Sequence, residues 1–187
     1  SKGIHDVYEI EDHPFRKPIM ITKASDRIGK PYIEVDADRI VGVIECNVPD
    51  EARAFKDADP ITNQIGQNVA DFLLDNMRKG LIPKSFLNLQ SGVGSGANAV
   101  LGALGQCPEV PNFNIYTEVL QDAPVQLMRD GRVLSASSCS LTVTNECLEG
   151  IYRDIDFFKD KLVLRPSEIS NCPEVIARIG VCSLNTA

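Results

Sequence analysis

The residues that decide the fold of this chain read Phe86-Leu-Asn-Leu-Gln-Ser-Gly-Val-Gly-Ser-Gly-Ala-Asn-Ala-Val-Leu101 and, after a short loop, Phe113-Asn-Ile-Tyr-Thr-Glu-Val-Leu-Gln-Asp122. The apolar run at 86–89 predicts a strand, and the glycines after it predict a loop. Small residues at 97–104 predict a helix, and residues 113–116 predict a second strand. This order is that of a βαβ unit, in which a crossover helix joins two parallel strands.

The glycine loop Gly92–Gly96 and the carboxylate Glu118 each follow one of these predicted strands. A right-handed crossover places the carboxyl ends of both strands on one edge of the sheet, where open α/β sheets bind ligands. We therefore expect the loop and Glu118 to be neighbours. Successive backbone N–H groups in such a loop can bind a phosphate or an oxyanion. The glycines can equally serve only a tight turn and close helix packing, so the loop alone leaves both interpretations open.

Two kinds of function fit this pattern. Gly92-x-Gly94-x-x-Ala97 fits the dinucleotide fingerprint, with Glu118 placed to bind a ribose, although Gln90 and Ser91 are polar where that fingerprint has a hydrophobic strand end. Alternatively, Glu118 is a nucleophile that attacks an activated acyl group, with the loop supplying donors for the oxyanion. In that case Asn171 can orient the carboxylate through its amide, although Asn171 taken alone favours an ordinary helix N-cap.

The rest of the chain from residue 59 alternates helices and strands. Asp59 and Pro60 predict the start of a long helix, which the apolar spacing extends to residue 79, and Gly80 predicts its end. Similar signals predict strands at 133–138, 161–165 and 181–184 and helices at 122–128, 144–153 and 171–180. Such alternation predicts an α/β fold, with a mostly parallel sheet and helices on both of its faces.

The first 55 residues have a different character. They are polar and interrupted by prolines, with short strands predicted at Ile19–Thr22 and Arg39–Glu45. Residues 48–59 have the composition of a linker. We expect residues 1–55 to be the end of an upstream α/β domain with its linker, and residues 56–187 to form a second α/β domain.

Composition and charge argue against several classes of function. The chain has 187 residues and a net charge of −7, which argues against nucleic acid or an anionic membrane as a partner. It has no apolar run of membrane length and no secretory leader pattern. Its two histidines and six cysteines lack metal-ligand spacing, so we expect no metal site and no histidine-based catalytic triad. Reduced cysteines in the core indicate a cytoplasmic protein.

The chain also carries four motifs in a fixed order. They read Leu89-Gln-Ser-Gly-Val-Gly-x-x-Ala-Asn-Ala-Val100, Tyr116-Thr-Glu-Val-x-Gln-Asp122, Asp156-Phe-Phe-x-x-Lys-x-x-Leu-Arg165 and Ile169-Ser-Asn171. Together they resemble the acetyl-CoA hydrolase/transferase family, which belongs to the class I CoA-transferases. The resemblance runs from about residue 35 to the last residue and is far more specific than one glycine loop. It favours the acyl-transfer interpretation over the dinucleotide one.

This resemblance implies catalytic roles for Glu118, Asn171 and Val93. Glu118 would attack an acyl-CoA thioester and, by way of an anhydride, become a glutamyl-CoA thioester, with Asn171 beside it. The backbone of Gly92, Val93, Gly94, Ser95 and Gly96 would line the oxyanion and CoA site. Arg53, which aligns loosely with an arginine of the family's interdomain segment, would bind the substrate carboxylate.

The resemblance also implies the partners of the full-length protein. They are an acyl-CoA and a short carboxylate, with coenzyme A as a substrate and no further cofactor. The full-length protein is expected to be a homodimer that transfers CoA or hydrolyses acetyl-CoA. Because members of the family are more than twice as long and pair two related α/β domains, we expect these residues to be part of such a protein, ending before a second glycine loop.

Overall fold

A computed structural model describes residues 3–48, 50 and 58–185 of the chain. Its centre is a five-stranded sheet in which every pair of neighbouring strands is parallel. In spatial order the strands are β6 (Leu162–Leu164), β4 (Val133–Ser138), β2 (Phe113–Tyr116), β1 (Asn88–Ser91) and β7 (Val181–Leu184). A separate parallel pair consists of β3 (Val119–Leu120) and β5 (Ser140–Leu141).

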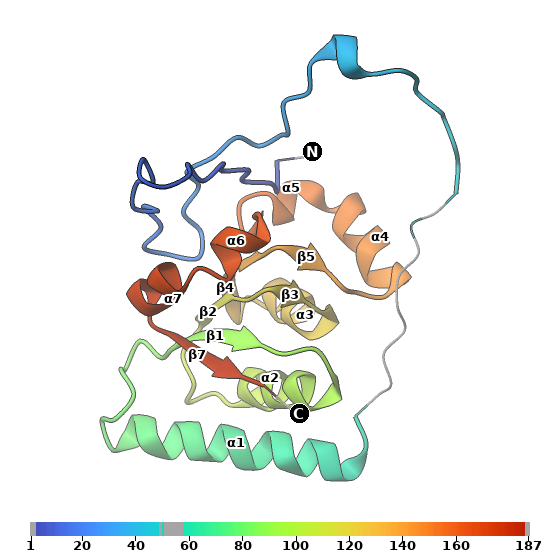
Figure 1. The fold of residues 1–187 in the computed structure, drawn as a ribbon. Helices are drawn as coiled ribbons and strands as arrows, with labels where there is room; N and C mark the ends of the chain where they lie inside the picture. Colours follow the sequence, from blue (N-terminus) through green and yellow to red (C-terminus); the bar gives the residue numbers. More distant parts are fainter. Residues whose placement is uncertain (1–2, 49, 51–57, 186–187) are drawn as a thin grey trace.

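Helices cover the sheet and connect its strands (Figure 1). They are α1 (Pro60–Arg78), α2 (Ser95–Gln106), α3 (Asp122–Arg129), α4 (Asn145–Arg153), α5 (Ile155–Phe158), α6 (Ser167–Ser170) and α7 (Pro173–Ile179), with a 3₁₀ turn η1 (Ala37–Arg39). The predicted α/β fold with a mostly parallel sheet is confirmed. The short elements β3, β5, α5 and α6 were not predicted, because two to four residues carry too little pattern to identify.

Local capping signals explain why the long elements begin and end where they do. The side chain of Asp59 accepts a hydrogen bond from Thr62 N at the start of α1, and Thr144 accepts one from Cys147 N at the start of α4. Gly180 ends α7 in the left-handed conformation that favours glycine. By contrast, β1 begins two residues later than predicted, because Phe86 has a positive φ and closes a turn onto Pro83 O.

The two faces of the sheet pack against different parts of the chain. Along β2, Phe113 and Ile115 belong to the larger core, which they share with α1, α2, α3 and the other strands. Tyr116 points to the opposite face and packs in a second core, which includes Ile169 of α6 and Val175 and Ile179 of α7. Side chains alternate across a strand, so this one strand contributes to both cores. Helices therefore lie on both faces, as the sequence predicted.

The N-terminal segment is part of the second core. Ile19 and Ile21 are buried there, but neither belongs to a strand, so the strand predicted at 19–22 is wrong. The turn that follows explains this, because Thr22 N and Thr22 Oγ1 both donate to the Asp26 carboxylate and bend the backbone. The segment reaches the core through its side chains and forms no sheet ladder there.

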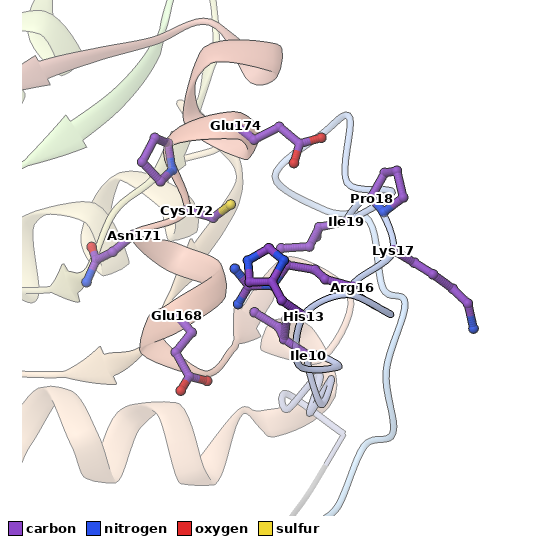
Figure 2. Close-up of a pocket in the computed structure, with 11 residues that line it drawn as sticks. Ile10, His13, Arg16, Lys17, Pro18, Ile19, Glu168, Asn171, Cys172 and Glu174 are labelled. Carbon is purple, nitrogen blue, oxygen red and sulfur yellow. The ribbon is translucent and has the colours of Figure 1, made fainter.

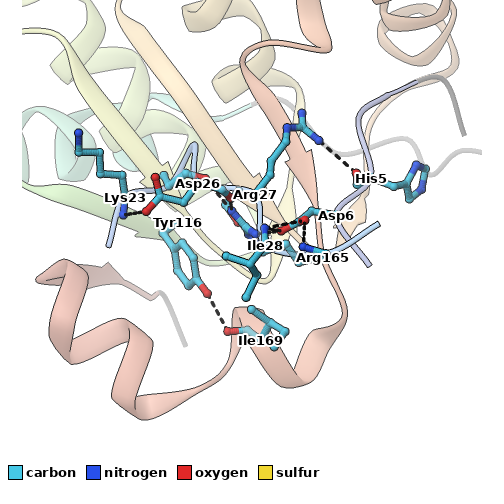
Figure 3. Close-up of polar contacts among 12 residues, drawn as sticks. His5, Asp6, Lys23, Asp26, Arg27, Ile28, Tyr116, Arg165 and Ile169 are labelled. Carbon is cyan, nitrogen blue, oxygen red and sulfur yellow. Dashed lines mark hydrogen bonds and ion pairs between the residues drawn. The ribbon is translucent and has the colours of Figure 1, made fainter. Parts of the chain in front are cut away.

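A buried ion pair between Asp6 and Arg165 fixes this segment to the end of β6 (Figure 3). The Asp6 carboxylate also accepts hydrogen bonds from Ile28 N at 3.0 Å and Gly29 N at 2.6 Å. Arg165 donates as well to Ser137 Oγ at 2.8 Å and to the carbonyl of Asp26. Burial lowers the pKa of Arg165, while the nearby Asp6 charge acts in the opposite direction. Buried charges are tolerable only when they are satisfied in this way.

Residues 30–48 leave the compact part of the chain as an extended arc (Figure 1). The strand predicted at 39–45 is wrong: a 3₁₀ turn ends at Arg39, and the backbone after it pairs with no strand among the described residues. Val41, Val43 and Ile44 are each more than 80% exposed. An apolar sequence can become a strand only if a neighbouring strand accepts its hydrogen bonds.

The predicted division into residues 1–55 and 56–187 remains a prediction. The boundary falls within 51–57, outside the described residues, while residues 4–30 pack against the sheet and its helices. None of the described helices is long and apolar enough to cross a membrane.

The buried ion pair leads to a prediction about stability. Asp6→Ala should lower the free energy of unfolding by about 3–5 kcal/mol, because it leaves the Arg165 guanidinium buried without a counter-charge. Asp6→Asn keeps an acceptor for Ile28 N and Gly29 N and should lose less. Urea unfolding measures both. Asp156→Ala, which breaks an exposed pair with Lys159, is the control and should change stability little. A loss below about 1 kcal/mol in Asp6→Ala would contradict this account.

Candidate active site

Three neighbouring strands of the sheet end side by side at the candidate site. Gln90 of β1 is in register with Ser183 of β7, and Leu89 is in register with Ile115 of β2. The connection after β1 leads to α2, whereas α6 and α7 lead into β7 from the opposite face. Connections that leave to opposite faces create a crevice at the carboxyl ends of parallel strands, which is the usual ligand site of open α/β sheets.

A cavity of about 280 Å³ lies at this edge. It brings together Glu118, which follows β2, and Asn171, which follows α6. Both side chains are exposed to solvent. The cavity is lined by Gln90, Tyr116, Glu118, Ser170, Asn171, Ile176, Val181, Ser183 and Asn185. Two residues that the sequence singled out separately therefore share one cavity.

The glycine loop is adjacent to this cavity but does not line it. Gln121 links the two segments, since its Nε2 donates to Gly92 O at 2.9 Å and its Oε1 accepts from Gly94 N at 3.1 Å. Thr117 Oγ1 also donates to Ser91 O at 3.0 Å. The expectation that the loop and the Glu118 segment are neighbours is confirmed by these contacts.

Part of the loop backbone is already used for these contacts. Gly92 N donates to Leu184 O at 2.9 Å and Gly94 N donates to Gln121. Among the described residues, the Val93 N–H donates to no acceptor, and the N–H groups of Ser95 and Gly96 lie in the first turn of α2, where backbone N–H groups have no partner within the helix. Val93 is 52% exposed and does not line the cavity that contains Glu118. These three N–H groups are the donors that the loop can offer to an anion.

Glu118 is held through its backbone, which leaves its carboxylate available. Its carbonyl accepts from Ser138 Oγ at 2.7 Å and from Cys139 N at 2.9 Å, both at the end of β4. This contact fixes the position of Glu118 relative to the sheet, as a nucleophile requires.

Asn171 is fixed relative to the same strand by a buried tyrosine. Tyr116 Oη donates to Ile169 O at 2.7 Å, and Ile169 and Asn171 belong to one turn (Figure 3). Burial raises the pKa of Tyr116 to about 12, so the hydroxyl remains a donor at physiological pH. Because Tyr116 lies two residues before Glu118, one side chain connects the two candidate catalytic residues. The sequence pattern alone does not indicate this role for Tyr116.

A second cavity, of about 360 Å³, lies on the outer side of α6 and α7 (Figure 2). His13, Arg16 and Lys17 of the N-terminal segment border it, together with Asn171. In Figure 2 the Asn171 amide points away from His13 and Arg16. The amide is thus directed away from this cavity, and Glu118 does not line it. We therefore place the candidate active site in the smaller cavity.

Two other sequence predictions concern groups beyond this cavity. Arg53, the predicted carboxylate-binding residue, lies outside the described residues. Among the residues that are described, no group of three or more His, Cys, Asp or Glu side chains is placed to hold a metal ion.

Comparison with known proteins places this geometry in context. No family model matches the chain. It is 45% identical over 172 residues to a propanoyl-CoA:succinate CoA transferase of Escherichia coli, an alignment that covers 92% of this chain and 35% of the relative. It is 40% identical to a succinyl-CoA:acetate CoA-transferase of Clostridium kluyveri, covering 100% of this chain and 34% of that protein. An acetyl-CoA hydrolase of Schizosaccharomyces pombe is 37% identical, with 99% and 35% covered.

This chain is homologous to one segment of the CoA-transferases and acetyl-CoA hydrolases. It spans about a third of the length of the curated relatives that it matches.

Solved structures agree at the level of the fold. RipA from Yersinia pestis matches 81% of the chain with a TM-score of 0.63 and 25% identity, over 33% of its own length. A 4-hydroxybutyrate CoA-transferase from Porphyromonas gingivalis matches 72% of the chain and 32% of its own length, with a TM-score of 0.52 and 22% identity.

The dinucleotide interpretation has no support from these comparisons.

The tyrosine contact leads to a prediction. Tyr116→Phe removes the buried hydroxyl that donates to Ile169 O, which still accepts from Cys172 N at 3.2 Å, and should lower the free energy of unfolding by about 0.5–1.5 kcal/mol. Thermal or urea unfolding measures the change. The control is Tyr152→Phe, since Tyr152 Oη bonds to Asp50 at the surface and its loss should matter less. Equal stability of Tyr116→Phe and the unsubstituted protein would show that this hydrogen bond contributes nothing.

Proposed function

We propose that the full-length protein transfers CoA between an acyl-CoA and a short carboxylate, or hydrolyses acetyl-CoA, with Glu118 as the nucleophile. One observation carries the proposal: Glu118 and Asn171, which come from different parts of the sequence, line one cavity at the carboxyl edge of the sheet. The relatives named above are enzymes of these two kinds, which supports the choice of reaction.

In the proposed reaction, a Glu118 carboxylate oxygen attacks the carbonyl carbon of the acyl-CoA thioester. The C–O bond forms, the C–S bond breaks, and CoA leaves as a thiolate, so that an acyl-glutamyl anhydride remains on the protein. The thiolate then attacks the glutamyl carbonyl and releases the first carboxylate, which gives a glutamyl-CoA thioester. A second carboxylate takes the CoA by the reverse steps, whereas attack by water at the thioester would give hydrolysis.

The other residues have roles that follow from this chemistry. Negative charge develops on the carbonyl oxygen at each attack, and the backbone of Gly92–Gly96, with Val93 central, is proposed to stabilise it and to line the CoA site. The Asn171 amide is proposed to orient the Glu118 carboxylate by donating to one of its oxygens. Arg53 is proposed to bind the substrate carboxylate as a bidentate donor.

The proposal extends to the partners of the protein. Coenzyme A acts as a substrate, and we propose that no resident cofactor or metal is needed, because the carboxylate itself supplies the nucleophile. A homodimer in the cytoplasm is the expected form of the full-length protein.

A nucleophilic Glu118 has a direct test in the full-length protein. Glu118→Ala should reduce CoA exchange between acetyl-CoA and succinate by at least about 10³-fold, since it removes the group that forms the covalent intermediate. Intact-mass measurement after acetyl-CoA alone should find CoA attached to the unsubstituted protein and not to Glu118→Ala. Hydroxylamine should convert the attached thioester to a hydroxamate at Glu118.

The control for this test is Glu149→Ala, which removes an exposed carboxylate elsewhere on the surface and should retain both activity and adduct. Exchange by Glu118→Ala within about tenfold of the unsubstituted enzyme, a difference of only ~1.4 kcal/mol, would exclude Glu118 as the nucleophile. Omitting succinate and measuring the release of free CoA distinguishes hydrolysis from transfer.

A further inference from the structure

Two polar atoms in the wall of the active-site cavity have no hydrogen-bond partner. They are Ser170 Oγ and Gln90 Oε1, and each is fully buried. Ser170 is only 2% exposed, and both residues line the cavity that contains Glu118. Buried polar atoms without a partner are rare because they lose their bonds to water and gain none in return. Such atoms are expected where a ligand supplies the missing partner.

Nearby serines of the same sheet differ in this respect. Ser137, which is 0% exposed, accepts from Arg165 Nε at 2.8 Å, and Ser138 Oγ donates to Glu118 O at 2.7 Å. The end of β4 therefore satisfies its buried hydroxyls, whereas the cavity wall does not. The residues that carry the unsatisfied atoms line the cavity in which the proposed substrate would sit.

The chemistry of each atom defines what it would bind. A serine hydroxyl can donate, and the oxygens of thioesters, carboxylates and anhydrides can only accept. Gln90 Nε2 already donates to Asn185 Oδ1 at 3.2 Å, which leaves Oε1 as an acceptor in need of an N–H group. Short carboxylates and thioester groups carry no N–H. The amide of the thiol arm, two carbons from the sulfur of an acyl-CoA, does.

We propose that Ser170 donates a hydrogen bond to the reacting oxygen of the acyl group, and that Gln90 accepts one from the first amide N–H of the thiol arm. This inference rests on the proposed function and assigns two further substrate-contacting residues to that site. Ser170 precedes Asn171, and both residues line the cavity that contains Glu118. Negative charge develops on the acyl oxygen during attack, so the Ser170 hydrogen bond strengthens at that stage.

The test for Ser170 compares stability with catalysis in the full-length protein. Ser170→Ala should leave the melting temperature unchanged or raise it, because the hydroxyl has no partner to lose. It should lower kcat for acetyl-CoA:succinate exchange about 10- to 100-fold, the usual effect of removing a donor to developing charge. Ser170→Thr, which keeps a hydroxyl, should restore part of the rate. Ser137→Ala is the matched control and should lower the melting temperature while the folded protein keeps its kcat.

The test for Gln90 uses two thioesters. Gln90→Met has nearly the same length but lacks the amide. It should reduce kcat/KM for acetyl-CoA about tenfold or more, and reduce the rate with S-ethyl thioacetate, which has no amide N–H, by less than twofold. Equal losses with both thioesters would overturn the role of Gln90.

Failure of this inference can be separated from failure of the proposed function. A CoA adduct on Glu118 of the unsubstituted protein, together with unchanged kcat in Ser170→Ala, would leave the function in place and overturn the role of Ser170. A Ser170→Ala variant that loses kcat only in proportion to a fall in melting temperature would also overturn it. Absence of both adduct and exchange in the unsubstituted protein would overturn the function itself.

Discussion

The position of β1 between β2 and β7 is the constraint on which the site depends. Parallel pairing on both sides brings three strand ends to one edge, where Gly92 lies beside Asn185 and next to the Glu118 segment. A Cβ atom at Gly92 would lie 2.9 Å from Asn185 Oδ1 and 3.3 Å from Leu184 O. A glycine there lets the chains after β1 and β7 approach each other closely. The loop thus has a packing role whatever anion it binds.

The features that the sequence predicted correctly depend on contacts between residues that are close together in the chain. The caps at Asp59, Thr144 and Gly180 are contacts between residues a few positions apart, so the pattern alone locates those helix ends. The strand expected at 39–45 depended on a distant partner, and no local pattern shows whether that partner is present. The chemistry of the amide suggested a link between Asn171 and Glu118, and the family resemblance favoured it. The sequence did not identify Ser170 and Gln90 as site residues. Their side chains become buried without hydrogen-bond partners only when β7 pairs with β1 and α6 packs on Tyr116.

In the described part of the chain, some buried polar groups are fully hydrogen-bonded and others have no hydrogen-bond partner. The Asp6–Arg165 pair is fully satisfied by backbone and side-chain partners, and it fixes the N-terminal segment to the sheet. The cavity beside Glu118 keeps two polar atoms unsatisfied. Satisfied networks stabilise one arrangement, whereas unsatisfied groups lower the stability of the free protein and raise its affinity for a matching ligand.

The bond from Tyr116 to Ile169 has a consequence for protein engineering. Glu118 follows β2, Asn171 follows α6, and this bond joins the two segments across a buried core. A loop graft that moved only residues 117–121 onto another parallel sheet would transfer the carboxylate without its orienting amide. The smallest transplantable unit is therefore discontinuous: β2 with its extension to Gln121, together with the turn from Pro166 to Asn171, and a recipient scaffold must be chosen for the spacing between these two pieces.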